Sequence, residues 1–132
     1  MKLETVTYRA ASGWSAPLPA ELDSEQTLVL AFAAPEFGAS PVPLGQLAAA
    51  FPRAALVGCS TSGEIAGTQV NDASISVAVA RFGRTRLRRA LTEVSGPDDS
   101  FEAGVRLAAA LAGPDLRAVF LLSDGLCVNG TP

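Results

Sequence analysis

The sequence predicts an α/β (α+β) fold, a mixed sheet with a parallel βαβ start, a β-hairpin and flanking helices. Two short, continuous apolar runs have the length and composition of buried strands, and a segment with helical spacing lies between them. A third segment alternates between apolar and polar residues, as a half-buried strand does. With 132 residues, 48% of them hydrophobic and 17% charged, the chain is large and apolar enough for one globular domain.

The first half of the chain is expected to supply the βαβ unit. "TLVLAFAA" (27–34) and "AALVGCS" (54–60) are the two continuous apolar runs, which predict strands covered on both faces. The residues between them at helical spacing are Leu44, Leu47, Ala48 and Phe51. Because a helix connects the two strands, we expect them to be parallel. Residues 1–26 contain a short alternating run, "ETVTY", which fits an edge strand, but are otherwise expected to be an irregular lead-in.

The second half is expected to add a hairpin, a helix and a third buried strand. "SISVAVARF" (74–82) and "RTRLRRALTEV" (84–94) predict a hairpin with its turn around Phe82–Arg84. Its second strand would carry Arg84, Arg86 and Arg88 on one face. We expect that face to be solvated and to protect the sheet edge from pairing with another strand; the alternative is that it meets an acidic partner.

The helix of the second half begins at a cap at 98–100 and ends at Gly113-Pro114. Its apolar stripe consists of Phe101, Val105, Ala108, Leu111 and Ala112. Asp99 and Glu102 have the spacing of a capping box. "RAVFLLSDG" (117–125) then supplies the third buried strand, over 117–123.

The last residues, "NGTP", have the pattern of a helix start, with Thr131 as the N-cap and Pro132 as the first helical residue. We therefore expect an incomplete domain over 27–132, truncated at the start of a helix. Such a domain is expected to pair with its missing C-terminal portion or with a second copy of the chain.

Composition excludes several classes of protein. A net charge of −3 argues against a nucleic-acid surface. No apolar run is long enough to cross a membrane, and the N-terminus lacks the core of a signal peptide, so we expect a cytoplasmic protein without membrane insertion. Cys59 and Cys127 are then expected to be free thiols.

The stretch "GCSTSGEI" (58–65) nearly matches two catalytic motifs. Gly58 and Gly63 have the spacing of a phosphate-binding loop, but Glu64 stands where that loop has its lysine. It also differs from a nucleophile elbow, because Ser62 replaces the second glycine. The chain contains no histidine, so it cannot form a Ser-His or Cys-His relay.

Loops that follow parallel strands meet at the carboxyl edge of a sheet, where ligands bind. If strands 54–59 and 117–123 run the same way, their loops share that edge. Hydroxyls, carboxylates and glycine N–H groups there suit a zwitterionic amino acid. The candidate residues are Ser60, Thr61, Ser62, Gly63, Glu64, Asp124 and Gly125. The alternative is that the hydroxyls cap their own turn and that Glu64 is solvated or holds the turn, with Cys59 a small buried hydrophobe.

The strings "LVGCSTSGEI", "DASISVAVARF" and "VFLLSDGLCVNGT" resemble the N-terminal part of the FIST domain (FIST N), from about residue 25 to the end. That domain is a sensory module of bacterial signalling proteins and, in diverged form, of some F-box proteins. The resemblance implies a small-ligand sensor rather than an enzyme, with an amino acid or a derivative as ligand. It also adds Asn129 to the candidate residues, as part of the string D-G-x-x-x-N-G.

Some members of the family bind haem, but the absence of histidine removes a usual axial ligand, leaving Cys59 or Tyr8. We therefore expect no cofactor. Two other functions remain open: a non-catalytic interaction or scaffold fragment that pairs with a missing second half, and an enzyme that uses Cys59 or Ser60.

Overall fold

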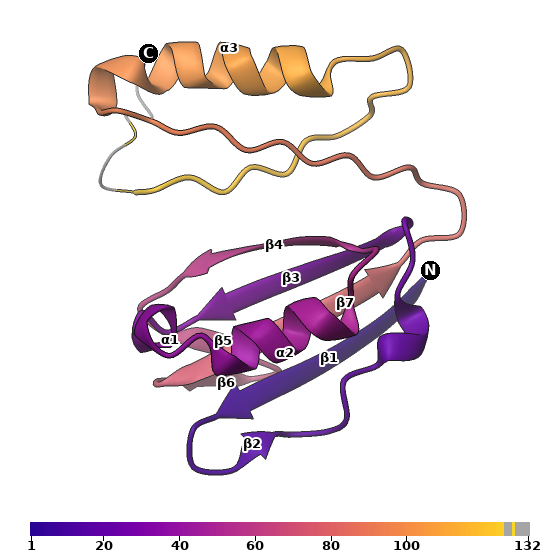
Figure 1. The fold of residues 1–132 in the computed structure, drawn as a ribbon, viewed down its shortest axis with the longest axis vertical. Helices are drawn as coiled ribbons and strands as arrows, with labels where there is room; N and C mark the ends of the chain where they lie inside the picture. Colours follow the sequence, from indigo (N-terminus) through magenta and orange to yellow (C-terminus); the bar gives the residue numbers. More distant parts are fainter. Residues whose placement is uncertain (126–127, 129–132) are drawn as a thin grey trace. The chain divides into compact units, whose positions relative to one another are not determined.

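The structure, a computed structural model, describes residues 1–125 and residue 128. It divides into two compact units, Met1–Leu87 and Arg88–Pro132. Figure 1 shows the elements of each unit along the chain.

The first unit is built on a five-stranded mixed sheet with the order β2-β1-β7-β3-β4. β3 and β4 are parallel, whereas β7 is antiparallel to both of its neighbours, β1 and β3. The strands are β1 (Lys2–Arg9), β2 (Gly13–Trp14), β3 (Thr27–Ala33), β4 (Ala55–Ser60) and β7 (Ser74–Arg81). This arrangement confirms the predicted mixed sheet and its parallel βαβ start.

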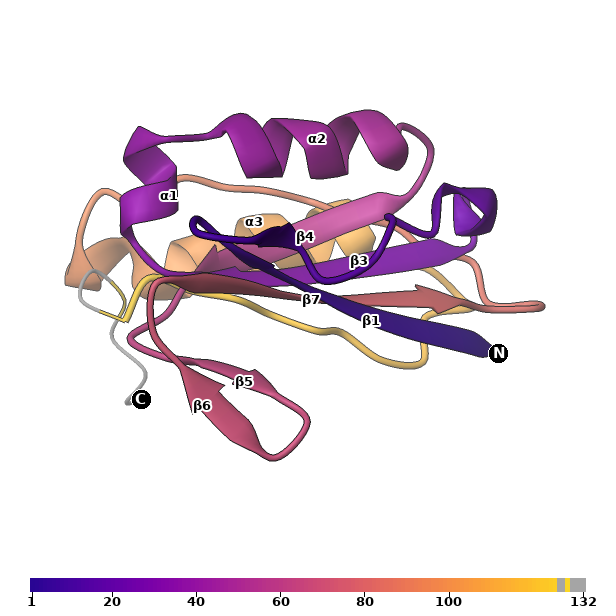
Figure 2. The same ribbon diagram turned by 90° about the horizontal axis from the view of Figure 1, so that it is seen from below.

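Short helices and a small hairpin complete the first unit. The 3-10 helix η1 (Ala20–Leu22) precedes β3, and the helices α1 (Glu36–Ala39) and α2 (Val42–Ala50) connect β3 to β4. Figure 2 shows α1 and α2 over one face of the sheet, whereas the hairpin of β5 (Glu64–Ala66) and β6 (Gln69–Asn71) projects from the other side.

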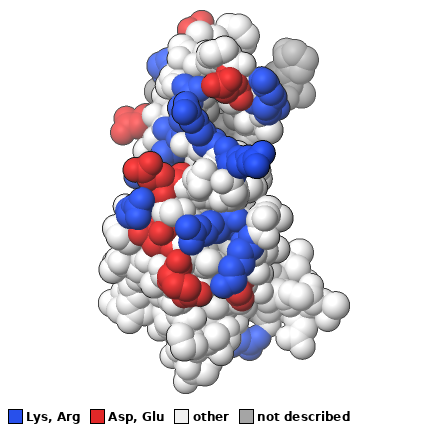
Figure 3. Space-filling model, turned by 90° about the vertical axis from the view of Figure 1, so that its right-hand side faces the viewer, with Lys and Arg blue, Asp and Glu red and all other residues white. Residues whose placement is uncertain are grey.

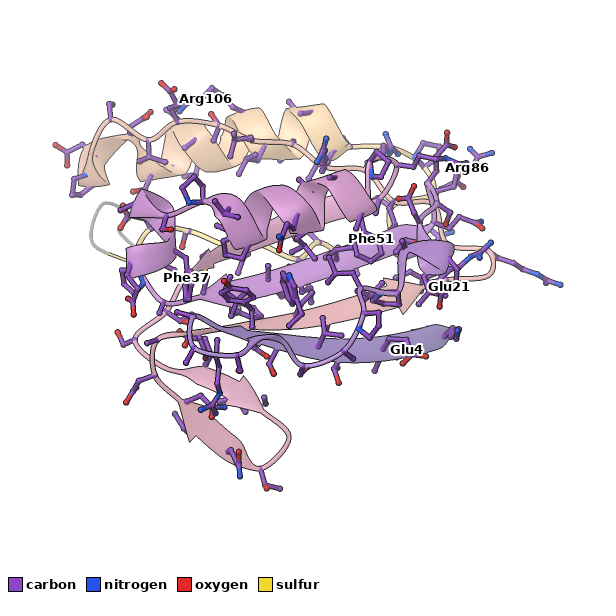
Figure 4. The ribbon with its side chains drawn as sticks, turned by 60° about the horizontal axis from the view of Figure 1, so that its bottom comes forward. Glu4, Glu21, Phe37, Phe51, Arg86 and Arg106 are labelled. Carbon is purple, nitrogen blue, oxygen red and sulfur yellow. The ribbon has the colours of Figure 1, made fainter. Side chains whose placement is uncertain are left out.

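The core lies between the sheet and these helices. Every second residue is buried along β3 and, in β7, from Ile75 to Val79, as the pleat of a strand requires, and the intervening residues are only half-buried. The prediction that strand 27–34 is covered on both faces is therefore wrong for one face. Fully buried apolar side chains of the strands, Val29, Ile75, Val77 and Val79, share the core with Leu47 of α2 and with Phe37 and Phe51, which are labelled in Figure 4.

The N-terminal segment is more regular than the sequence indicated. β1 pairs along its whole length with β7, and Tyr8 makes edge-to-face contacts with Trp14 and Phe37 at centroid distances of 5.2 and 5.7 Å. Trp14 also donates a hydrogen bond from Nε1 to Gln46 of α2 at 2.8 Å. The lead-in is thus part of the folded unit.

The predicted hairpin partner of β7 is absent. β7 lies between β1 and β3, so neither of its edges is free, and residues 84–94 form no strand. The structure instead has a hairpin earlier in the chain, formed by β5 and β6.

The second unit contains the 3-10 helix η2 (Pro97–Asp99) and the helix α3 (Ser100–Leu111), and its described residues include no strand. The predicted helix is confirmed, but its apolar stripe is uncovered: Phe101 is 77% exposed and Val105 47%. The prediction of a buried strand over 117–123 is wrong. Those residues are irregular and mostly exposed, because no described strand of this unit offers them an edge.

An ion pair, not a capping box, holds the start of α3. Asp99 occupies the N-cap position but makes no capping hydrogen bond with its side chain. Its carboxylate instead accepts two hydrogen bonds from Arg106, at 3.1 and 3.0 Å, and one from the backbone N–H of Ser95. The pKa of Asp99 is lowered from 3.8 to about 2, mainly by the hydrogen bonds from Arg106.

Candidate functional site

A small hollow opens where β3 and β4 end, at the carboxyl edge of the parallel pair. Its volume is about 160 Å³. It is lined by Ala34, Pro35, Glu36, Thr61, Ser62, Glu64, Asp72 and Ala73, all of the first unit. The hollow therefore includes three of the residues that the sequence singled out, Thr61, Ser62 and Glu64.

Glycine at position 58 is explained by the approach of two strands. Gly58 of β4 stands opposite Ala31 of β3, and a Cβ atom built on Gly58 would lie 2.0 Å from the carbonyl oxygen of Ala31. Because that neighbour is backbone, it cannot move aside cheaply. At Gly63 the nearest atom is a methyl of Val70 at 3.2 Å, so a side chain there meets a smaller obstacle.

Glu64 is buried and linked to both sides of the loop. It is 1% exposed, and its Oε1 accepts a hydrogen bond from Thr61 Oγ1 at 2.7 Å. Its Oε2 accepts hydrogen bonds from the Ser74 hydroxyl at 2.8 Å and from the Ser74 backbone N–H at 3.3 Å. The carboxylate thus joins the end of β4 to the start of β7, an arrangement that favours the alternative in which Glu64 holds its own turn.

The loop is also attached to β3 by its backbone. The N–H of Thr61 donates to the carbonyl of Ala33 at 2.9 Å, and the N–H of Ala34 donates to the carbonyl of Ser74 at 3.0 Å. After the loop the chain enters β5, not a helix, so the helix N-terminus that a phosphate-binding loop needs does not follow Gly63. The floor of the hollow is consequently fixed by hydrogen bonds between the elements that surround it.

Two further carboxylates at the hollow were missed by the sequence analysis. Glu36 is the first residue of α1, and Asp72 lies in the turn between β6 and β7; both are exposed. In the described part of the chain neither side chain has an ion-pair or hydrogen-bond partner. Glu36 directly follows Pro35, the residue that ends the predicted strand 27–34. This position in the sequence could have indicated that Glu36 lies at the same edge of the sheet.

The turn that carries Asp72 has an unusual backbone. Ala73, also in the lining, has a φ of 49°, in the left-handed region that disfavours residues with a side chain. Strained backbone of this kind is often found at ligand sites. Here the strained residue, Ala73, links the exposed Asp72 to the buried Ser74.

Two predicted site residues of the first unit, Ser60 and Gly63, are not among the residues that line this hollow. Ser60 is the exposed last residue of β4, and the half-buried Cys59 beside it is a free thiol. Asp124 and Gly125 belong to the second unit, and Asn129 and Cys127 lie outside the described residues. Because residues 117–123 form no strand, the structure does not supply the shared sheet edge that would bring the two loops together.

The arrangement is suited to binding a small polar molecule. The hollow offers the carboxylates of Glu36 and Asp72 for a cation and the hydroxyl of Ser62 for a hydrogen bond. Among the described residues no group of three histidine, cysteine or acidic side chains is placed to hold a metal ion, and no helix is both long and apolar enough to cross a membrane.

Comparison with known proteins identifies one family. The model of the FIST N domain matches residues 27–132, which is most of the chain. No match was found among curated proteins or among solved structures.

Proposed function

The chain belongs to the FIST N domain family, which is associated with sensing in signal transduction, and from this premise we propose that it binds a small molecule as the ligand-sensing module of a signalling protein. The proposed ligand is an amino acid or an amino-acid derivative. The proposed site is the hollow at the carboxyl ends of β3 and β4.

The observation that carries this proposal is the pair of unpartnered carboxylates at the carboxyl edge of a parallel strand pair. Ligands of open α/β sheets bind at that edge. Glu36 and Asp72 are available for an ammonium group, and the hydroxyl of Ser62 is available for a carboxylate or an amide.

The size of the hollow supports a ligand of amino-acid dimensions. A protein cavity of about 150 Å³ accommodates benzene, and this hollow has a volume of about 160 Å³. Pockets for drug-sized molecules are larger, about 300–1,000 Å³. A nucleotide or a haem exceeds the space that the described residues provide here.

In this proposal Glu64 supports the site and does not bind the ligand. Its Oε1 accepts a hydrogen bond from Thr61, its Oε2 accepts hydrogen bonds from Ser74, and the residue is almost fully buried. Asp72 and Glu36 therefore take over the role of ammonium partner that the sequence suggested for Glu64. The module acts by binding, without catalysis, in a cytoplasmic signalling protein.

A second candidate function is an interaction module that pairs with another polypeptide. It is favoured by the exposed apolar side chains of the second unit, among them Phe101, Val119, Phe120 and Leu121, because a binding partner could remove them from water. The partner would be another polypeptide or another copy of the chain. Light scattering over a range of concentrations tests self-association directly.

The ligand proposal is tested by calorimetry with a panel of amino acids and their N-acetyl derivatives, which lack the ammonium group. We expect a free amino acid to bind, its N-acetyl derivative to bind more weakly, and Asp72→Asn to reduce the affinity about tenfold, equivalent to about 1.4 kcal/mol. Asp115→Asn is the matched control, because Asp115 is an exposed residue of the second unit whose side chain forms no hydrogen bond or ion pair with any other described residue.

Glu64→Gln separates binding from support in the same experiment. We expect it to lower the free energy of unfolding by about 1–3 kcal/mol, since it disturbs hydrogen bonds to a buried charged group. The affinity of the folded variant should remain within about threefold of the original, about 0.7 kcal/mol. Absence of binding by every panel member, or equal effects of Asp72→Asn and Asp115→Asn, would contradict the proposed site.

A further inference from the structure

A second, larger hollow lies at the opposite end of the sheet of the first unit, where β3 and β4 begin and β7 ends. Its volume is about 680 Å³. The lining residues are Asp23, Ser24, Glu25, Gln26, Arg53, Arg81, Arg86 and Leu87. Figure 4 shows Arg86 and Glu21 at this end of the unit, away from Phe37 of α1.

Three arginines from different segments line this hollow. Arg81 ends β7, Arg86 follows it in an irregular segment, and Arg53 lies between α2 and β4. In the described part of the chain none of these guanidinium groups forms an ion pair or a side-chain hydrogen bond. Three unneutralised cations in one hollow repel one another, so an anion bound between them is favoured.

Hydrogen bonds hold the three segments around the turn at 23–27. The Oδ1 atom of Asp23 accepts the backbone N–H groups of Arg53 and Ala54, both at 3.0 Å. The carbonyl of Gln26 accepts the N–H of Phe82 at 3.0 Å, and the Gln26 side chain donates to the carbonyl of Gly83 at 3.4 Å. The backbone at Arg53 and next to Arg81 is thus positioned before any ligand arrives.

The charges of the lining favour a compact anion over an extended polyanion. Arg53, Arg81 and Arg86 face two carboxylates, of which Asp23 is already used by backbone N–H groups and Glu25 is exposed. The lower part of Figure 3, which views the first unit from this end, shows basic and acidic side chains side by side. A nucleic-acid backbone needs a continuous basic stripe, and this surface does not provide one.

We propose that this hollow binds a small phosphate-bearing molecule through Arg53, Arg81 and Arg86. A phosphoryl group offers three strong acceptor oxygens and a charge of about −1.5 to −2 at pH 7, which suits three guanidinium donors. A carboxylate has two oxygens, which one guanidinium fork can occupy alone. The site is separate from the hollow proposed for the amino-acid ligand and does not depend on it.

The test is calorimetric titration of the chain with inorganic pyrophosphate at low ionic strength. We expect binding that weakens as sodium chloride is added, because exposed charges are screened. Arg81→Gln and Arg86→Gln should each reduce the affinity at least tenfold, as expected for the loss of a charge-assisted hydrogen bond. Glu25→Gln should strengthen binding about two- to fivefold, because it removes from the lining a negative charge that repels the anionic ligand.

Arg84→Gln is the matched control. Arg84 is exposed and two residues from Arg86, but it is not part of the lining, so its loss should change the affinity by less than about twofold. Equal effects of Arg84→Gln and Arg86→Gln would show general charge attraction and overturn the proposal. Absence of pyrophosphate binding, or equally tight binding of the dicarboxylate malonate, would overturn it as well.

Discussion

The two units of the chain have comparable apolar sequences but very different burial. In the first unit the alternating buried residues of β3 and β7 share a core with Phe37, Leu47 and Phe51, and all of these residues are 8% exposed or less. In the described part of the second unit only Ala103 is a buried apolar residue, whereas Leu91 is 96% exposed and Phe120 60%. Apolar composition therefore makes a core only where other elements supply strand edges and cover.

The largest test of this comparison deletes one apolar side chain from each unit. Leu47→Ala removes a fully buried side chain and should lower the free energy of unfolding by about 2–5 kcal/mol. Phe120→Ala removes an exposed one and should change it by less than about 0.5 kcal/mol.

Urea denaturation measures both variants with two probes. The single tryptophan, Trp14, reports on the first unit, and far-ultraviolet circular dichroism also reports on α3. A large loss of stability in Phe120→Ala would show that residues 117–123 pack against other groups, and the contrast between the units would then fail.

A smaller effect is expected from the tight approach of β3 and β4 inside the first unit. Gly58→Ala places a methyl group against the carbonyl of Ala31 and should cost about 1–3 kcal/mol in thermal or urea unfolding. Gly63→Ala is the control, because its new methyl group meets only the side chain of Val70; its cost should be less than half as large. Equal costs at the two positions would mean that the strands separate easily.

The sequence was informative where a pattern depends on neighbours along the chain. The apolar run at 27–34 and the spacing of Leu44, Leu47 and Phe51 predicted β3 and α2, because strand and helix periodicities are local. The hairpin was placed wrongly because β7 pairs with β1 and β3, which are distant in sequence. The same limitation explains the error at 117–123, where apolar residues alone suggested a buried strand.

Part of the candidate site was predictable for the same reason. Thr61, Ser62 and Glu64 follow β4 directly, so a single loop brings them to the edge of the sheet. Asp72 and the three arginines of the second hollow reach their places through β6, β7 and the loop after α2. These residues come close only because strands that are distant in the sequence pair in the sheet, and no local sequence pattern predicts this.

The smallest predicted effect concerns the start of α3, where the second unit relies on an ion pair rather than on a core. Asp99 has its pKa lowered to about 2 by hydrogen bonds from Arg106 and from the Ser95 N–H, whereas its ordinary value is 3.8. A carboxylate whose pKa is lowered in the folded state contributes its full stabilisation at pH values above its pKa in the unfolded state. This contribution is lost as the pH falls through its pKa in the folded state. The helix should therefore lose this support between about pH 4 and pH 2, with α3 helicity falling in that range.

Carboxyl titration by nuclear magnetic resonance measures the pKa of Asp99, and circular dichroism follows the helix. In Arg106→Gln the pKa of Asp99 should rise toward 3.8, because its main cause of lowering is removed. Asp99→Asn should remove this contribution to the pH dependence of α3 while leaving the Trp14 fluorescence of the first unit unchanged at neutral pH. A pKa near 3.8 in the unaltered chain would show that the pair with Arg106 is not maintained in solution. The second unit would then lack even this local constraint on the start of its helix, and the contrast with the hydrogen-bonded loop around Glu64 would be sharper.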